Sequence, residues 1–391
     1  MIRANQKQDD SDQAYVAIKK LNDDTSDEEL RQGWEAEAKA LDEISGLNHD
    51  NIISRVAAFT RGRNRYFMFE WANGGNLRDF WQKLPLPRLN AELVKEILVQ
   101  LHDLASALHA LHNYKGKGSY RHGDLKPENI LRFSNKTALG KLKIADMGLA
   151  KHHRLATELR HHRTDTRYGT ARYEPPEALT ALPNEARSRL YDIWSIGCII
   201  LEFIIWLLYG LNGLNKFSED TKGNFSDEVG FFTIEAVGHR RAARLHPAVE
   251  AWMDYISKDQ ECAKATAIRY LLEVVKTKLL IVRLPKRRES SSETTGGPIS
   301  LTRATSEMQP SPERTTAEIL CDSLKNIWDT AKADPNYWFT GKDRGKIQRP
   351  WPVMPNRVAD DDLLSPESAR QPRDGTLLAP FQKQNVCRVP L

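Results

Sequence analysis

Arg-His-Gly-Asp-Leu-Lys-Pro-Glu-Asn, residues 121–129, places a carboxylate, an ammonium group and an amide at fixed spacing on one short loop. A carboxylate such as Asp124 can hold an attacking hydroxyl group and accept its proton, while Lys126 can neutralise charge on transferring phosphate oxygens. The amide of Asn129 can offer an oxygen ligand to Mg²⁺. These residue types in this order indicate phosphoryl transfer.

The loop resembles the catalytic loop of eukaryotic protein kinases, and further motifs follow it in that family's order. Leu-Lys-Ile-Ala-Asp-Met-Gly at 142–148 reads as a short strand and resembles the family's metal-binding Asp-Phe-Gly element. Residues 169–177 are similar to the end of an activation segment, and residues 192–197 to the start of the central helix of the large lobe. The resemblance implies that Asp146 and Asn129 are the metal ligands.

Upstream, Val-Ala-Ile-Lys at 16–19 resembles the strand whose lysine pairs the α- and β-phosphates of ATP. A capping box at 26–29 opens the helical pattern that follows. Glu37 stands in the register at which the family places the glutamate partner of that lysine, and Glu35 is the competing choice. We prefer Glu37, and expect Lys19 to position the nucleotide.

Residues 66–77 resemble the last strand of the small lobe and the hinge that binds adenine. The resemblance implies that backbone groups of Glu70 and Ala72 bond the adenine ring. It also implies that Asn76 belongs to the nucleotide-binding residues.

The substrate class follows from two residues of the resemblance. Lys126, two positions after Asp124, is the pattern of serine/threonine kinases, whereas tyrosine kinases carry different residues there. Thr170 stands where that family lets a threonine hydroxyl bridge the catalytic Asp and Lys. The catalytic residues implied are therefore Asp124, Lys126 and Thr170.

The resemblance implies an α+β fold of two lobes, with a truncated small β lobe and a mainly helical large lobe. We expect a disordered N-terminus, a partial small lobe, a large lobe, a flexible insert, a final large-lobe helix and a largely disordered tail. These segments span residues 1–13, 14–72, 73–284, 285–313, 314–341 and 342–391. The insert and tail are identified by serine, threonine, proline and charged residues without a sustained period.

The final helix motif, Arg-x-x-Ala-x-x-Leu, begins at Arg314. The resemblance implies that Arg314 forms an ion pair with Glu177 at the end of the activation segment.

Protein kinases also begin with two strands joined by a Gly-x-Gly-x-x-Gly turn, whose N–H groups cover the phosphates. Residues 1–13 contain no glycine and few apolar residues, so they do not predict such a turn. The strand at 16–19 is then expected to have an unpaired edge. Two functions remain open: an active protein serine/threonine kinase, or a pseudokinase or truncated kinase that binds nucleotide or protein as a scaffold.

Composition adds bounds on partners and location. The 391 residues include 57 basic and 52 acidic side chains. They contain no basic stripe with interleaved aromatic residues, so nucleic acid is not an expected partner. The four cysteines form no Cys-x-x-Cys pair and read as reduced thiols of the cytoplasm, with the nucleus possible. Residues 193–211 are apolar enough to cross a membrane, but their position after Asp192 favours a buried core helix.

Taken as an active kinase, the chain is expected to bind ATP and Mg²⁺ and to transfer the γ-phosphate to serine or threonine hydroxyls of a protein substrate. A monomer without nucleic acid or membrane partners is the expected form.

Overall fold

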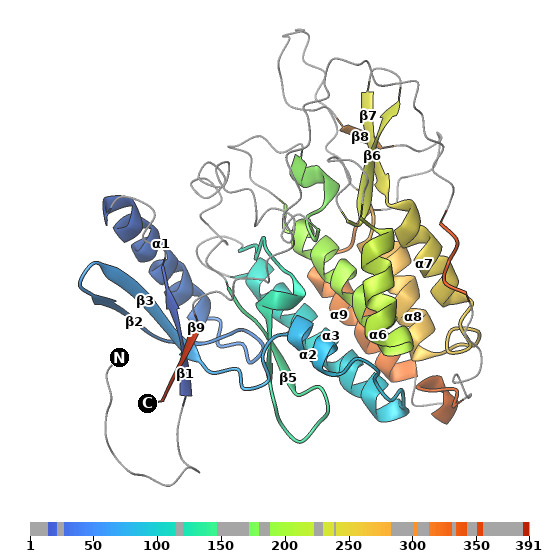
Figure 1. The fold of residues 1–391 in the computed structure, drawn as a ribbon, viewed down its shortest axis with the longest axis horizontal. Coiled ribbons are helices and arrows are strands. Elements are labelled where there is room, and N and C mark those ends of the chain that lie inside the picture. The colour runs from blue at the N-terminus through green and yellow to red at the C-terminus, as the bar shows by residue number, and fades with distance from the viewer. Residues whose placement is uncertain are drawn as a thin grey trace, which may run out of the picture.

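The computed structural model describes residues 15–21, 27–114, 120–146, 172–179, 188–222, 230–237, 240–282, 301–303, 313–330, 334–341, 350–354 and 386–390. Figure 1 shows two lobes: a smaller one formed by a sheet with helix α1, and a larger, mainly helical one. The α+β, two-lobed fold expected from the sequence is confirmed.

The small lobe is a four-stranded sheet in the order β2-β3-β1-β9. Its elements are β1 (Tyr15–Lys20), α1 (Asp27–Ser45), β2 (Arg55–Arg61), β3 (Asn64–Glu70) and β9 (Val386–Pro390). Trp34 of α1 stacks on the fully buried Phe67 of β3, with ring centroids 6.0 Å apart. The apolar stripe of α1 therefore covers one face of the sheet, as an amphipathic helix requires.

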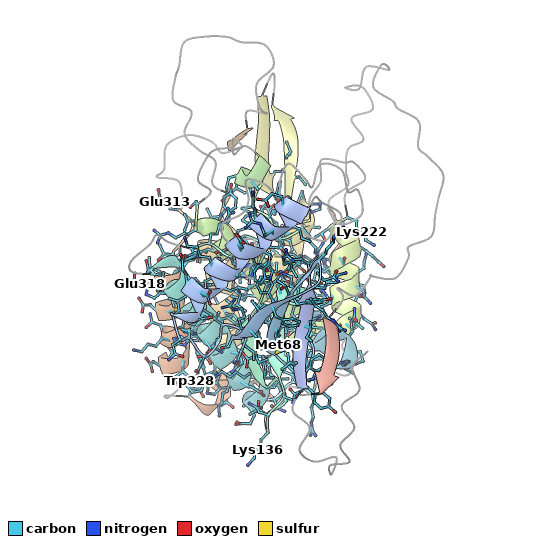
Figure 2. The ribbon with its side chains drawn as sticks, turned by 90° about the vertical axis from the view of Figure 1, so that its left-hand side faces the viewer. Met68, Lys136, Lys222, Glu313, Glu318 and Trp328 are labelled. Carbon is cyan, nitrogen blue, oxygen red and sulfur yellow. The ribbon has the colours of Figure 1, made fainter. Side chains whose placement is uncertain are left out.

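Strand β9 corrects the prediction made for the edge of β1. β1 pairs antiparallel with β3 on one side and antiparallel with β9 on the other, with Tyr15 opposite Pro390 and Lys19 opposite Val386. The expectation of an unpaired edge is wrong, because the C-terminal end of the chain returns to the small lobe (Figures 1 and 2). The tail at 342–391 was expected to be largely disordered, and no strand was predicted in it.

The large lobe contains the remaining elements. They are α2 (Leu77–Lys83), α3 (Ala91–His112), η1 (Pro127–Asn129), β4 (Ile130–Phe133), β5 (Lys141–Ile144), η3 (Pro176–Leu179), α6 (Leu190–Asp220), β6 (Phe232–Val237), β7 (Arg240–Leu245), α7 (Pro247–Ser257), α8 (Ala267–Val274), η4 (Val275–Leu279), β8 (Leu301–Arg303), α9 (Ala317–Thr330) and η6 (Pro335–Tyr337).

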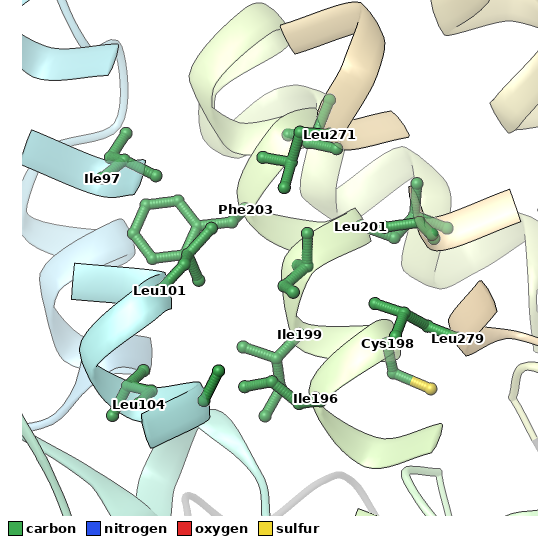
Figure 3. Packing of buried hydrophobic residues seen from close by; sticks show 14 of the residues in the cluster. Ile97, Leu101, Leu104, Ile196, Cys198, Ile199, Leu201, Phe203, Leu271 and Leu279 are labelled. Carbon is green, nitrogen blue, oxygen red and sulfur yellow. The ribbon is translucent and has the colours of Figure 1, made fainter. Parts of the chain in front are cut away.

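Helix α6 is the centre of the large-lobe core. It is long and apolar enough to cross a membrane, yet 94% of its most apolar window is buried inside the protein. Figure 3 shows its side chains packed between Leu101 of α3, Leu271 of α8 and Leu279 of η4. The structure thus confirms the core-helix interpretation of residues 193–211.

Of the insert predicted at 285–313, the structure describes only residues 301–303 and 313. Residues 301–303 form β8, which was not predicted and which pairs parallel with β7 from Arg241 opposite Leu301 to Ala243 opposite Arg303. Together with β6 these strands form a separate three-stranded sheet. A strand this short carries too little alternation to be read from sequence.

The two lobes meet at β5. Ile53 N–H donates to the carbonyl of Ile144 at 2.9 Å, and Ile144 N–H donates to the carbonyl of Asn51 at 2.8 Å. Lys143 Nζ forms an ion pair with Glu70 Oε1 at 2.7 Å. A large-lobe strand is therefore joined by backbone bonds to the segment that precedes β2.

Candidate active site

Asp192, at the start of α6, holds the loop of residues 121–129 in place. Its fully buried carboxylate accepts hydrogen bonds from the His112 ring at 2.8 Å and from the N–H groups of His122 and Gly123, each at 2.9 Å. Burial is the largest single influence and opposes ionisation of Asp192, but the hydrogen bonds from His112 and Gly123 and the electrostatic attraction of His112 and His122 together outweigh it, so the pKa of Asp192 is lowered. Gly123 has φ of 78°, a backbone conformation that favours glycine.

The loop brings its three predicted functional residues together. Lys126 Nζ lies 2.9 Å from Asp124 Oδ2. Asn129 Nδ2 donates to the carbonyl of Asp124 at 2.8 Å and to its Oδ2 at 3.2 Å. One carboxylate is therefore oriented by a cation and by an amide at the same time.

A second group of charges joins the two lobes. Lys19 Nζ lies 3.1 Å from Glu37 Oε1 and 2.8 Å from Asp146 Oδ1. Glu35 instead pairs with Arg31 at 2.7 Å on the exposed face of α1. The structure confirms the preference for Glu37 as the partner of Lys19.

The Lys19–Asp146 pair keeps both groups charged at neutral pH. The positive charge of Lys19 lowers the pKa of Asp146 to about 2. Burial alone would lower the pKa of Lys19, but the negative charges of Asp146 and Glu37 raise it above its ordinary value. Because the pKa of Asp146 is depressed on folding, the pair stabilises the fold above about pH 4 and loses that effect as the pH falls toward 2.

Backbone contacts place Asp146 beside the loop. The His122 ring donates to the carbonyl of Ala145 at 2.8 Å, and Ala145 N–H donates to the carbonyl of Asn129 at 2.9 Å. Asp146 itself has φ of 63°, an uncommon conformation for a residue other than glycine. Met147 and Gly148, the rest of the Asp-x-Gly motif, lie outside the described residues.

Asn129 and Asp146 can each provide a side-chain oxygen, which is the kind of ligand that Mg²⁺ prefers. Because Asn129 directs its amide nitrogen at Asp124, its side-chain oxygen is the end that a cation would contact. Over the described ranges, the structure contains no cluster of three or more His, Cys, Asp or Glu side chains that could hold a metal alone. Mg²⁺ is usually bound by one or two protein oxygens together with substrate phosphates and water, so this pair is sufficient.

The other residues predicted to bind nucleotide make contacts outside the two charged groups described above. The Glu70 side chain is engaged by Lys143, and the Ala72 carbonyl accepts the N–H of Gly75 at 3.2 Å in a turn. Asn76 Oδ1 accepts the N–H of Asp79 at 2.8 Å as the N-cap of α2, which is a structural use of that side chain. Adenine bonding by the backbone of Glu70 and Ala72 stays a prediction, and Thr170 lies outside the described residues.

A buried polar network below the loop was not predicted. Glu202 of α6 accepts the hydroxyl of Tyr173 at 2.8 Å and lies 3.3 Å from both Arg78 and Arg172. Arg78 also pairs with Glu128 of the loop at 3.0 Å. The network therefore links α2, the loop, the residues before η3 and the central helix.

The sequence did contain a signal for this network. Glu202 is an acidic residue inside an otherwise apolar run, and a buried charge must be paired.

Tyr173→Phe is expected to lower the free energy of unfolding by about 1.5–3 kcal/mol, because it removes a buried hydrogen bond to a charged acceptor. Urea denaturation measures the change. Tyr270→Phe is the matched control, since Tyr270 is 41% exposed, and should change stability by less than about 0.5 kcal/mol. Equal effects of the two substitutions would contradict the role given to the Tyr173 hydroxyl.

A small lobe with a Lys–Glu pair, above a loop that groups Asp, Lys and Asn beside a second Asp, defines the kinase class of fold. A family model described as protein kinase domain matches residues 4–229. The chain therefore belongs to the protein kinase family.

Individual relatives agree. Serine/threonine-protein kinase unc-51 of Caenorhabditis elegans is 30% identical over 172 residues, which cover 42% of this chain and 18% of that protein. Serine/threonine-protein kinase Nek9 of Mus musculus is 29% identical over 279 residues, covering 69% and 26% respectively. Cyclin-dependent kinase-like 5 of Homo sapiens is 30% identical over 188 residues, covering 48% and 17%. The chain spans about a sixth to a quarter of the length of these relatives.

Proposed function

We propose that the chain is a protein serine/threonine kinase that transfers the γ-phosphoryl group of ATP to a serine or threonine hydroxyl of a protein. One observation carries this proposal: Lys19, Asp124, Lys126, Asn129 and Asp146 are brought together by direct contacts in the arrangement that phosphoryl transfer uses. Membership of the kinase family and the serine/threonine kinases among the relatives support it.

Each residue has a distinct task in the proposed reaction. Asp124 holds the attacking hydroxyl and accepts its proton as the new bond to phosphorus forms and the bond to the β-phosphate oxygen breaks. Lys126, which already contacts Asp124, neutralises charge on the γ-phosphate. Lys19, fixed by Glu37, holds the α- and β-phosphates. Bound Mg²⁺ supplies charge neutralisation at the phosphates, and Asn129 and Asp146 are the residues that would hold it.

The acceptor and setting are also part of the proposal. The relation of Lys126 to Asp124 supports serine or threonine rather than tyrosine as the acceptor. The scattered cysteines, of which Cys198 and Cys262 are buried free thiols, support a reducing compartment such as the cytoplasm or nucleus. We propose a monomer as the acting form.

Mg²⁺-ATP is expected to stabilise the protein, and ATP with excess EDTA is expected to do so much less, because Asn129 and Asp146 act through the metal. At about a hundred times the dissociation constant, the free energy of unfolding should rise by about 2.7 kcal/mol. Thermal-shift titration measures this effect.

Lys19→Met should remove most of the shift, because it takes away the cation that holds the phosphates. Lys325→Met on the exposed surface of α9 is its control and should retain the full shift. Absence of any shift with Mg²⁺-ATP in the unsubstituted chain would instead favour the protein-binding scaffold.

A further inference from the structure

The edge of β1 is covered by a segment from the far end of the chain. Five register pairs join β1 and β9, from Tyr15 opposite Pro390 to Lys19 opposite Val386. On its other side β1 is paired with β3. The strand that carries the phosphate-binding lysine is therefore held on both sides, once by its neighbour in the small lobe and once by the C-terminus.

The edge that β9 occupies has the properties of a peptide-binding site. An edge strand presents a row of backbone N–H and carbonyl groups, which an extended peptide can pair with by adding a strand. The segment Val-Cys-Arg-Val-Pro at 386–390 suits this pairing, because valine is favoured in strands and proline is tolerated at a strand end.

A second contact ties the same tail to the large lobe. Trp351 packs against Trp252 of α7, with ring centroids 5.4 Å apart, and against Tyr209 of α6 and Tyr255 of α7 at 6.0 and 6.3 Å. The C-terminal part of the chain therefore contacts both lobes. Because β9 is tethered to the protein, its pairing is intramolecular, with an effective concentration that can reach the order of mM.

Pairing at this edge bears on the charged cluster of the site. Lys19 is the last residue of β1 in the β9 register, and it contacts both Glu37 and Asp146. Loss of β9 would expose backbone groups of β1 and allow its end to fray, which would move Lys19 relative to Asp146.

We propose that the edge of β1 is a binding site for an extended peptide, that its ligand is the chain's own segment 386–390, and that occupancy of the site holds Lys19 in position. The occupant is a removable strand rather than part of a hairpin, since it is not joined to β1 by a turn.

The test uses full-length variants that impair only the backbone of β9. In an antiparallel pair alternate N–H groups face the partner, so either Cys387→Pro or Arg388→Pro must remove a donor that faces β1. At least one of them should increase hydrogen exchange of the β1 amides by tenfold or more, and lower the melting temperature by about 2–4 °C. Arg388→Ala keeps the backbone donor and should leave both quantities unchanged.

A synthetic peptide of residues 384–391, added to the affected proline variant, should restore protection of β1. The same peptide carrying the proline substitution should not. These measurements need no nucleotide, so they can fail while the proposed kinase activity stands, and the reverse also holds.

Three results would overturn the proposal. One is unchanged exchange of the β1 amides in both proline variants. A second is loss of structure that the peptide does not reverse. The third is β1 protection that depends on protein concentration and accompanies a dimer in light scattering, which would make a second copy of the chain the occupant.

Discussion

Asp124→Asn is expected to lower the rate of phosphoryl transfer by about 10²–10⁴-fold, because an amide cannot accept the proton of the attacking hydroxyl. The affinity for Mg²⁺-ATP should change little, since the residues proposed to hold the nucleotide and metal are Lys19, Asn129 and Asp146. Transfer to a generic basic protein measures the first quantity, and thermal-shift titration the second.

The substitution is close to isosteric, so it separates chemistry from structure. The side-chain oxygen of an asparagine can still accept from Lys126 and Asn129, as Asp124 Oδ2 does now. Asp322→Asn, on the exposed surface of α9, is the control and should retain the unsubstituted rate. Equal residual transfer by Asp124→Asn and the unsubstituted protein would show that the measured activity belongs to a contaminant.

Arg314→Met is expected to destabilise the fold by about 3–5 kcal/mol, because it leaves the buried carboxylate of Glu177 without its cationic partner. Arg314 has no exposed side-chain surface and pairs with Glu177, with Nη2 3.2 Å from Oε2. It also donates to the carbonyls of Ile281 at 2.6 Å and Leu190 at 2.9 Å. Its guanidinium lies over the ring of Trp194 at 5.0 Å. Urea denaturation measures the loss.

A double variant shows how the loss arises. Adding Glu177→Gln to Arg314→Met removes the unpaired carboxylate, so part of the stability should return. Arg269→Met at an exposed position on α8 is the control and should change stability by less than about 0.5 kcal/mol. A loss at Arg314 no larger than that of the control would mean that the ion pair does not hold the end of the activation segment to the large lobe.

Much of the site could be predicted because several of its functional residues lie close together in the sequence. Asp124, Lys126 and Asn129 lie on one loop, so their grouping follows from the chain itself. The choice of Glu37 over Glu35 depended on the helical register of α1, and the structure agrees with it. The Arg314–Glu177 pair, expected from the resemblance, is present as well.

Other features depend on contacts that no local pattern encodes. The five-residue strand β9 has no amphipathic period, and its partner β1 lies at the opposite end of the sequence. Asn76 was assigned to the nucleotide because it follows the hinge, yet an asparagine just before a helix also satisfies an N-cap. The structure shows that local hydrogen bond, which the sequence analysis did not weigh against nucleotide binding.

The backbone bonds at β5 restrict how the lobes can move. Separation of the lobes as rigid bodies would break the bonds between Ile53, Ile144 and Asn51, leaving buried N–H and carbonyl groups without partners. Rotation about an axis through β5 keeps those bonds and changes mainly the spacing of groups farther from the axis. The site would therefore open by rotation of one lobe relative to the other, and nucleotide would enter and leave during that rotation. The Lys19–Asp146 ion pair, which joins the two lobes, would have to break as the site opens.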